Sequence, residues 1–352
     1  MHAPGTLNAA QSSTAEKLAF LRRPGAYAHA PPEVSVRETH MSWVFLAGER
    51  AYKLKKPVRF PFLDFSTLAS REAACRTELA LNRRLAPDVY LDVAPLTAGA
   101  DGLSIGGDGA VVDWLVVMRR LADRGSLEHA IASGSLTRAQ LDGLISVLTR
   151  FYRTARRVFV SPAAHLLAWR RAVALNRHIL LAPRLGLPAG LVRSVDGVQQ
   201  RFLAARGDLV ADRVRGRHIV DGHGDLRPEH IWLDHPVRII DCLEFNAALR
   251  AVDPLDEIAF LCLECERLGG GWAADHLAGR LTGALRRRPD DPLFWFYRCY
   301  RATLRARLAI AHLLEPDPRT PEKWPHLART YLRLARDDAR RIEAALRAPS
   351  GR

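Results

Sequence analysis

The sequence predicts an α+β fold of two lobes, a small lobe built on an antiparallel sheet and a larger, mainly helical lobe. Short strand-like runs dominate the chain up to about residue 118, and amphipathic helical stretches dominate after it. A short β-rich insert over residues 217–241 interrupts the helices. We expect an N-terminal segment at 1–25 that is not ordered throughout, the small lobe at 26–118 and the large lobe at 119–347.

The composition is that of a globular protein. The chain has 352 residues, which suits two domains or one two-lobed enzyme, and 48% of them are apolar. No apolar run is long enough to span a membrane. The sequence does not show the basic start followed by an apolar stretch that predicts a signal peptide. The five cysteines are scattered and odd in number, which is typical of reduced thiols. We therefore expect a cytoplasmic protein without a membrane partner.

The formal net charge is +14, and nearly all of the basic residues are arginine. Most of these arginines lie at helical spacing beside apolar residues, which favours solvated helix faces. A nucleic-acid-binding protein is expected to carry a basic stripe interleaved with exposed aromatic residues or a known binding module, and the sequence shows neither. We therefore expect no nucleic-acid partner.

Lysine is scarce, yet three of the five lysines fall within residues 53–56. Two strand-like runs, 44–46 and 52–54, flank a plausible hairpin turn at 47–50. In the second run Ala51, Lys53 and Lys55 share one face, because side chains alternate along a strand. A compact ammonium on this face suits phosphate groups. The alternative is an edge strand protected by lysines.

A helix follows the lysine strand and offers a carboxylate to hold a lysine. Its apolar residues Leu81 and Leu85 are four apart, Ser70 is a suitable N-cap, and Pro87 ends the run. Glu78 lies one turn before Leu81, and Glu72 is the alternative. Gly- and Asp-rich turns at 97–109 then precede an apolar strand at 111–118.

The large lobe is predicted to start with a helix. A capping box at 137–140 opens a helix through about residue 158, and further amphipathic stretches cover 162–183 and 192–214. Asp225 then lies in a tight loop after a short apolar strand at 217–220, and Asp241 ends another apolar run. Two carboxylates at strand ends suit a base and a metal ligand for phosphoryl transfer.

The loop containing His223-Gly224-Asp225-Leu226 resembles the catalytic loop of the aminoglycoside phosphotransferase-like kinases, and more distantly that of protein kinases. Further stretches strengthen the resemblance and are similar to an uncharacterised bacterial branch of that superfamily. They are residues 52–58, 62–66, 81–87, 244–250 and 253–259. The resemblance covers roughly residues 30–315 and implies a two-lobed protein-kinase-like fold.

The resemblance also implies roles around a nucleotide. ATP is the expected cofactor, with Lys53 on its phosphates, Lys55 as the rival lysine and Glu78 holding the lysine. Ala51 would pack on the adenine, and the hinge that pairs with adenine lies near residues 117–121, including Met118. The segment 39–42 stands where a glycine-rich loop usually covers the phosphates, and there Ser42 is a candidate donor to a phosphate.

The remaining roles concern the catalytic loop. Asp225 would accept or orient the hydroxyl proton of the acceptor, with His223 beside it, and Asp241 would bind magnesium. The family carries Asn where this chain has His230. Three roles for the histidine stay open. It would reach the metal through a water molecule, it would form a hydrogen bond to Asp225, or the site would work with a single metal ion. The resemblance implies that Asp256 braces the loop from below.

These features favour an ATP-dependent phosphotransferase acting on a hydroxyl of an unidentified small molecule. A nucleotide-binding pseudokinase is the first alternative. A metal-dependent phosphohydrolase built from His223, Asp225, His230 and Asp241 is the second. Cys262 and Cys265 lie in an apolar helical run without a second pair, so we interpret them as core residues.

Overall fold

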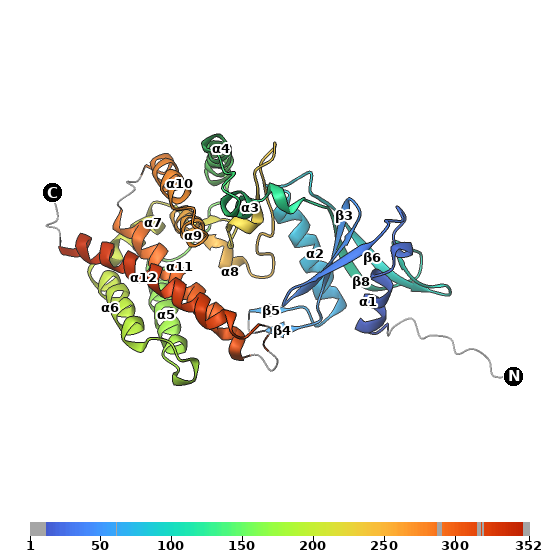
Figure 1. Ribbon diagram of the computed structural model, residues 1–352, viewed down its shortest axis with the longest axis horizontal. Helices are drawn as coiled ribbons and strands as arrows, with labels where there is room; N and C mark the ends of the chain where they lie inside the picture. The colour runs from blue at the N-terminus through green and yellow to red at the C-terminus, as the bar shows by residue number, and fades with distance from the viewer. Residues whose placement is uncertain (1–11, 61, 287–290, 315–317, 319, 348–352) are drawn as a thin grey trace. The chain divides into compact units, whose positions relative to one another are not determined.

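The computed structural model describes residues 12–60, 62–286, 291–314, 318 and 320–347 (Figure 1). The chain forms two compact units. The first contains Met1–Gly125 and Arg238–Ala247, and the second contains Ser126–Val237 and Ala248–Arg352. An antiparallel sheet in the first unit and a mainly helical second unit confirm the predicted fold class. Residues 1–11 of the predicted N-terminal segment lie outside the described residues, and helix α1 (Thr14–Leu21) follows them.

The first unit is built on a six-stranded sheet in the order β1-β2-β3-β8-β6-β7, with antiparallel neighbours throughout. Its strands are β1 (Val34–Glu38), β2 (Ser42–Ala47), β3 (Arg50–Lys55), β6 (Tyr90–Gly99), β7 (Gly102–Ile105) and β8 (Ala110–Arg119). A separate small hairpin joins β4 (Arg59–Phe60) to β5 (Leu63–Asp64). The predicted hairpin of β2 and β3 is confirmed, and Gly48 in its turn has a positive φ of 58° that favours glycine.

Helix α2 (Leu68–Asn82) packs on β8 and β6 (Figure 1). The prediction that Ser70 is its N-cap is wrong by about one turn. Thr67 caps the helix, and Ser70 stands at the third position, where its hydroxyl oxygen accepts from the Thr67 amide. Each side chain therefore satisfies a backbone amide of the other, which fixes the start of the helix.

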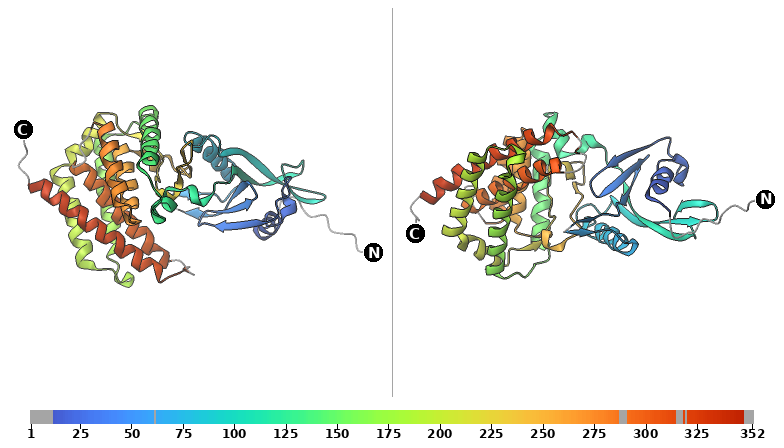
Figure 2. Two further views of the ribbon diagram at one scale, coloured as in Figure 1. Left: turned by 45° about the horizontal axis from the view of Figure 1, so that its top comes forward. Right: turned by 90° about the horizontal axis from the view of Figure 1, so that it is seen from below.

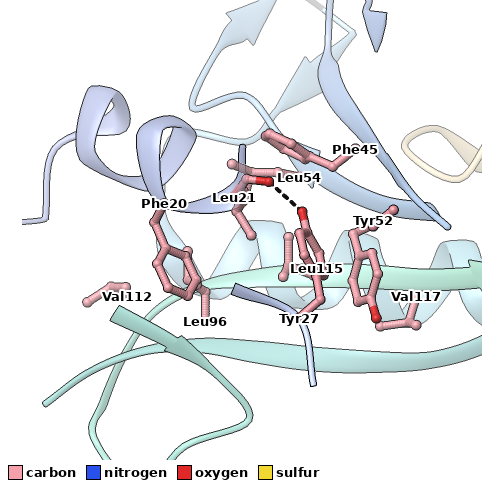
Figure 3. Close-up of a cluster of buried hydrophobic side chains, with 11 residues drawn as sticks. Phe20, Leu21, Tyr27, Phe45, Tyr52, Leu54, Leu96, Val112, Leu115 and Val117 are labelled. Carbon is pink, nitrogen blue, oxygen red and sulfur yellow. Dashed lines mark hydrogen bonds between the residues drawn. The ribbon is translucent and has the colours of Figure 1, made fainter. Parts of the chain in front are cut away.

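Strand β3 separates two apolar clusters, because its side chains alternate between the faces of the sheet. Tyr52 and Leu54 point to one face, where they pack with residues of α1, β2, β6 and β8 (Figure 3). There the Tyr27 hydroxyl donates to the Leu21 carbonyl at 2.5 Å, which ties the segment after α1 to this core. Ala51 belongs to the second cluster, which includes Cys75 of α2. Lys53 and Lys55 share this second face with Ala51, as the alternation predicts.

The second unit consists mainly of helices, and α11 and α12 lie side by side in it (Figures 1 and 2). Its longer helices are α3 (Leu127–Ala132), α4 (Arg138–Thr154), α5 (Pro162–Leu180), α6 (Ala189–Ala205), α7 (Gly207–Arg215), α9 (Pro254–Arg267), α10 (Gly271–Ala284), α11 (Pro292–Ala311) and α12 (Lys323–Arg347). The capping box of Thr137 and Gln140 at the start of α4 is confirmed. The stretch predicted at 192–214 is two helices, α6 and α7, with Arg206 at the junction.

Short elements surround the loop that contains Asp225. Strand β9 (Val220–Asp221) pairs antiparallel with β12 (Ala251–Val252). The loop continues through a turn of 3-10 helix, η4 (Pro228–His230), into β10 (Ile231–Trp232), and β11 (Arg238–Ile239) and α8 (Ala247–Arg250) follow. Across the described part of the chain, no helix combines the length and the apolar character that crossing a membrane requires.

Candidate functional site

Lys53 lies between two carboxylates of the first unit. Its ammonium group is 2.8 Å from Oε1 of Glu78 and 2.9 Å from Oδ1 of Asp241. The Glu78 side chain is fully buried, whereas the Asp241 side chain is 47% exposed. The structure therefore brings together the predicted phosphate lysine, its helix partner and the predicted metal ligand. Glu72, the alternative partner, instead pairs with Arg76 on the same helix.

Lys55 lies on the same face but is fully buried. Its ammonium group is 2.6 Å from Oε2 of Glu78, pairs with Glu244 and lies 4.9 Å from the centre of the Phe65 ring. Glu78 thus accepts from one lysine on each of its two oxygens. The Lys53 side chain keeps 14% of its surface exposed, so Lys53 is the more accessible of the two candidate lysines.

The charges in this network stabilise one another. Burial disfavours the ammonium form of Lys53, but the carboxylates of Asp241 and Glu78 outweigh it and raise the pKa of Lys53 well above its ordinary value. Burial likewise opposes ionisation of Glu78, yet the charges of Lys53 and Lys55 lower the pKa of this carboxyl. Both groups are therefore charged at neutral pH, as a phosphate-binding lysine and its partner need to be.

Two residues that the sequence reasoning missed hold the backbone around Asp241. The Asp241 amide donates to the Tyr90 hydroxyl at 3.1 Å, and the Cys242 amide donates to Oδ1 of Asn82 at 2.9 Å. Asp241 has a positive φ of 61°, which an aspartate adopts only rarely. These bonds come from α2 and β6, so the same elements fix Glu78 and the Asp241 segment. Asn82 lies within residues 81–87, one of the stretches that resemble the superfamily, and this resemblance could have identified it.

The remaining nucleotide candidates of the first unit lie on neighbouring strands. Ala51 on β3 is directly opposite Met118 on β8, and both are buried. Ser42 begins β2 opposite Lys55, and only 2% of its surface is exposed. The Ser42 carbonyl accepts from the amide of Thr39, which closes the turn before β2.

Glu257 braces the predicted catalytic loop in the second unit. This fully buried carboxylate accepts from the His223 amide at 3.0 Å, from the Gly224 amide and from the Tyr152 hydroxyl at 3.0 Å. A Cβ at Gly222 would lie 2.6 Å from Oε2 of Glu257, so this close approach requires glycine. Burial raises the pKa of Glu257, although the amide hydrogen bonds favour its charged form.

The prediction that Asp256 braces the loop is wrong. Asp256 forms a two-pronged ion pair with Arg301 of α11, with distances of 2.8 and 2.6 Å. Successive residues of a helix point in directions about 100° apart, so Glu257 faces the loop while Asp256 faces α11. Asp253 caps α9 by accepting from the Leu255 amide.

Asp225 is held by Arg227 of the same loop. Nε of Arg227 donates to Oδ2 of Asp225 at 3.0 Å, and Arg227 also pairs with Glu229. Burial opposes ionisation of Asp225, but the charges of Arg227 and Arg305 outweigh it and lower its pKa. Asp225 is therefore a carboxylate at neutral pH, with 24% of its side chain exposed.

His230 is engaged at both ring nitrogens. Nη2 of Arg227 lies 3.2 Å from Nε2, and Nδ1 lies 2.9 Å from the Asp225 carbonyl oxygen. Guanidinium only donates, so Nε2 accepts and Nδ1 carries the proton that bonds the carbonyl. Of the roles left open for His230, this geometry matches a hydrogen bond to Asp225. Acting as a metal ligand would require Arg227 to move.

His223 is also part of the loop structure. Its ring is buried, Nδ1 accepts from the Asp225 amide at 3.3 Å, and the rings of His223 and His230 are 6.2 Å apart. No group of three or more His, Cys, Asp or Glu side chains within the described residues is arranged to hold a metal ion. Cys262 and Cys265 are fully buried in α9, which agrees with their interpretation as core residues.

Comparisons with known proteins relate the chain to others by sequence and by fold. No family model matches the chain. Uncharacterized proteins Rv2004c of Mycobacterium tuberculosis (strain ATCC 25618 / H37Rv) and Mb2027c of Mycobacterium bovis are each 35% identical to it over 294 residues. The match covers 82% of this chain but 57% of each relative, so the chain spans little more than half of their length.

Two solved structures share its architecture. A choline/ethanolamine kinase family protein from Mesorhizobium loti superposes with a TM-score of 0.55 at 16% identity, covering 94% of this chain and 98% of that chain. The choline kinase from Cryptosporidium parvum Iowa II superposes with a TM-score of 0.53 at 10% identity, covering 94% and 96%. The predicted resemblance is thereby confirmed for the fold: the chain has the two-part, protein-kinase-like fold of these two kinases.

Proposed function

We propose that the chain is an ATP-dependent phosphotransferase that moves the γ-phosphate of ATP to a hydroxyl group of a small molecule. The observation that carries the proposal is the bridge from Glu78 through Lys53 to Asp241. It presents an ammonium and a partly exposed carboxylate together on one unit. This is the pair of groups that phosphoryl transfer uses to neutralise phosphates and to hold a metal ion.

The residues fit the cofactors by the chemistry of their donors. Lys53 would hold the ATP phosphates, and the carboxylate oxygens of Asp241 are the type of ligand that magnesium prefers. Bound magnesium would neutralise the charge that develops on the phosphates. The close pairing of Ala51 and Met118 would provide an apolar surface for the adenine.

Asp225 would act on the acceptor. The acceptor oxygen forms a bond to the γ-phosphorus, the bond from that phosphorus to the bridging oxygen of ADP breaks, and the hydroxyl proton passes to the Asp225 carboxylate. This role requires an ionised carboxylate, which the charge of Arg227 maintains. His223 would contribute by fixing the loop, because its ring nitrogen accepts the Asp225 amide.

A nucleotide-binding pseudokinase is the second candidate, because His230 replaces the family asparagine and both of its nitrogens are engaged. Magnesium-dependent ATP binding without turnover would identify it. The phosphohydrolase alternative predicts a tightly bound transition metal, which elemental analysis of the purified protein would detect.

Magnesium-dependent ATP turnover tests the proposal, with the wild type compared with Asp225→Asn. We expect slow ADP formation in the wild type, its acceleration by a hydroxyl acceptor, and its loss in the variant. Asp142→Asn serves as the matched control, because Asp142 is a half-exposed carboxylate of the second unit that pairs with His276. Turnover that is equal in Asp225→Asn and in the wild type would contradict the assigned base.

A further inference from the structure

Two arginines of the second unit are held in place by one buried carboxylate. Glu264 of α9 is fully buried, and its Oε2 lies 2.6 Å from Nε of Arg267. Its Oε1 lies 2.9 Å from Nε of Arg305, which comes from α11. The Tyr331 hydroxyl of α12 also donates to Glu264, at 2.7 Å from Oε1. One carboxylate thus fixes two guanidinium groups at the meeting point of three helices.

Both guanidinium groups also lie over one aromatic ring. The central carbons of Arg267 and Arg305 are 5.8 and 5.5 Å from the centre of the Tyr331 ring. The tyrosine therefore supports both cations by its face as well as by its hydroxyl. Rotation of either guanidinium would break its bond to Glu264 and its contact with the ring, so the two groups are preorganised.

Both arginines use only Nε in these contacts. Among the described residues, neither Nη atom of Arg267 or Arg305 has a hydrogen-bond partner. The Arg267 side chain is 18% exposed and the Arg305 side chain is 21% exposed. Both side chains are therefore mostly covered by protein but retain some contact with solvent. A guanidinium whose Nη groups are unpaired matches the oxygens of a carboxylate or phosphate.

The arginine pair belongs to the surroundings of the catalytic loop. Helix α9 packs against η4, the part of the loop that contains Glu229 and His230. Arg305 is close enough for its charge to act on Asp225 and on Arg227. Two guanidinium groups against one Glu264 carboxylate leave one positive charge. Glu229 opposes this charge, because its Oε1 is paired with Arg227 and its carboxylate also acts on the charge of Arg267.

We propose that Arg267 and Arg305 form an anion-binding site that takes a carboxylate or phosphate group of the acceptor. This inference rests on the proposed function, because it specifies the acceptor as an anionic hydroxyl compound. A cationic acceptor such as choline would meet the remaining positive charge there and would be disfavoured.

Inorganic phosphate is the probe, titrated calorimetrically into the full chain at low ionic strength. We expect binding to the wild type that weakens about tenfold or more in Arg267→Met and Arg305→Met, as the loss of a charged hydrogen bond implies. Arg305→Lys keeps the charge but removes the planar fork, and it should also weaken binding. Arg329→Met is the matched control on α12, where Arg329 is exposed and donates to the Gly186 carbonyl. A thermal unfolding curve for each variant identifies any that is not folded.

A second comparison separates the acceptor group from the phosphates of the nucleotide. Phosphate binding should persist in Lys53→Met and in the presence of magnesium and the analogue AMP-PNP. Displacement of phosphate by AMP-PNP would overturn the proposal, as would equal binding in folded arginine variants or no binding to the wild type. ATP turnover in the Asp225→Asn comparison reports on the proposed function separately. Arginine-dependent phosphate binding without turnover would leave the anion site standing and remove the kinase.

Discussion

The ammonium group of Lys55 lies 2.6 Å from Oε2 of Glu78, and neither side chain is exposed to solvent. Lys53 takes the other oxygen of the same glutamate but remains partly accessible. Two lysines that are two residues apart on one strand therefore have different surroundings. The difference predicts that substitution of Lys53 mainly affects the use of ATP, whereas substitution of Lys55 mainly affects the stability of the fold.

Lys55→Met should destabilise the protein by about 3–5 kcal/mol, because it leaves the buried Glu244 carboxylate without its lysine. Lys53→Met should lower kcat/KM for ATP with a smaller loss of stability. Urea unfolding and ATP turnover measure the two effects. Lys56→Met is the control, because its partner Glu38 is on the surface. The assignment of Lys53 to the phosphates would fail if Lys53→Met turned over ATP like the wild type.

Glu257→Gln should loosen the catalytic loop while the fold persists. The neutral amide loses charge-assisted bonds to the His223 and Gly224 amides, each contributing about 1.5–3 kcal/mol. Amide hydrogen exchange at these two positions should accelerate, and ATP turnover should fall. Asp256→Asn is the comparison, because Asp256 contacts Arg301 and not the loop. Unchanged exchange at His223 in Glu257→Gln would show that the carboxylate does not brace the loop.

His230→Ala should reduce turnover about tenfold, or roughly 1.4 kcal/mol in the barrier. The substitution removes the acceptor for Arg227 and the donor to the Asp225 carbonyl, which loosens the loop around Asp225. We expect the magnesium concentration for half-maximal turnover to stay the same. A large increase in that concentration would instead identify His230 as a metal ligand. His276→Ala on α10 controls for the loss of an imidazole that pairs with Asp142.

Asp338 should make stability depend on pH. Burial, only partly offset by Arg298, raises the pKa of this fully buried carboxyl from 3.8 to about 6. The folded state binds the proton more tightly than the unfolded chain, so stability falls as pH rises from about 4 to about 6 and then levels off. The shift corresponds to about 3 kcal/mol. Unfolding at several pH values should show this fall in the wild type relative to Asp338→Asn, and parallel curves would contradict it.

Local patterns in the chain predicted much of the first unit. The alternation of β3 placed Ala51, Lys53 and Lys55 on one face. In the second unit, the capping box at Thr137 needed only residues three positions apart. The sequence predicts Ser70 as the N-cap of α2, but the cap is Thr67. The two hydroxyl residues are three positions apart and form the capping box together, so either is a plausible cap from the sequence alone.

The sequence by itself determined the fold class, the lysine strand, the helix with Glu78 and the loop with Asp225, since these depend on periodicity and short motifs. Only the tertiary structure decided that Lys55 is buried, that Glu257 rather than Asp256 reaches the loop, and that Glu264 holds Arg267 and Arg305. These outcomes depend on which face of a helix packs against which neighbour. That choice joins residues far apart in the chain, and no local spacing encodes it.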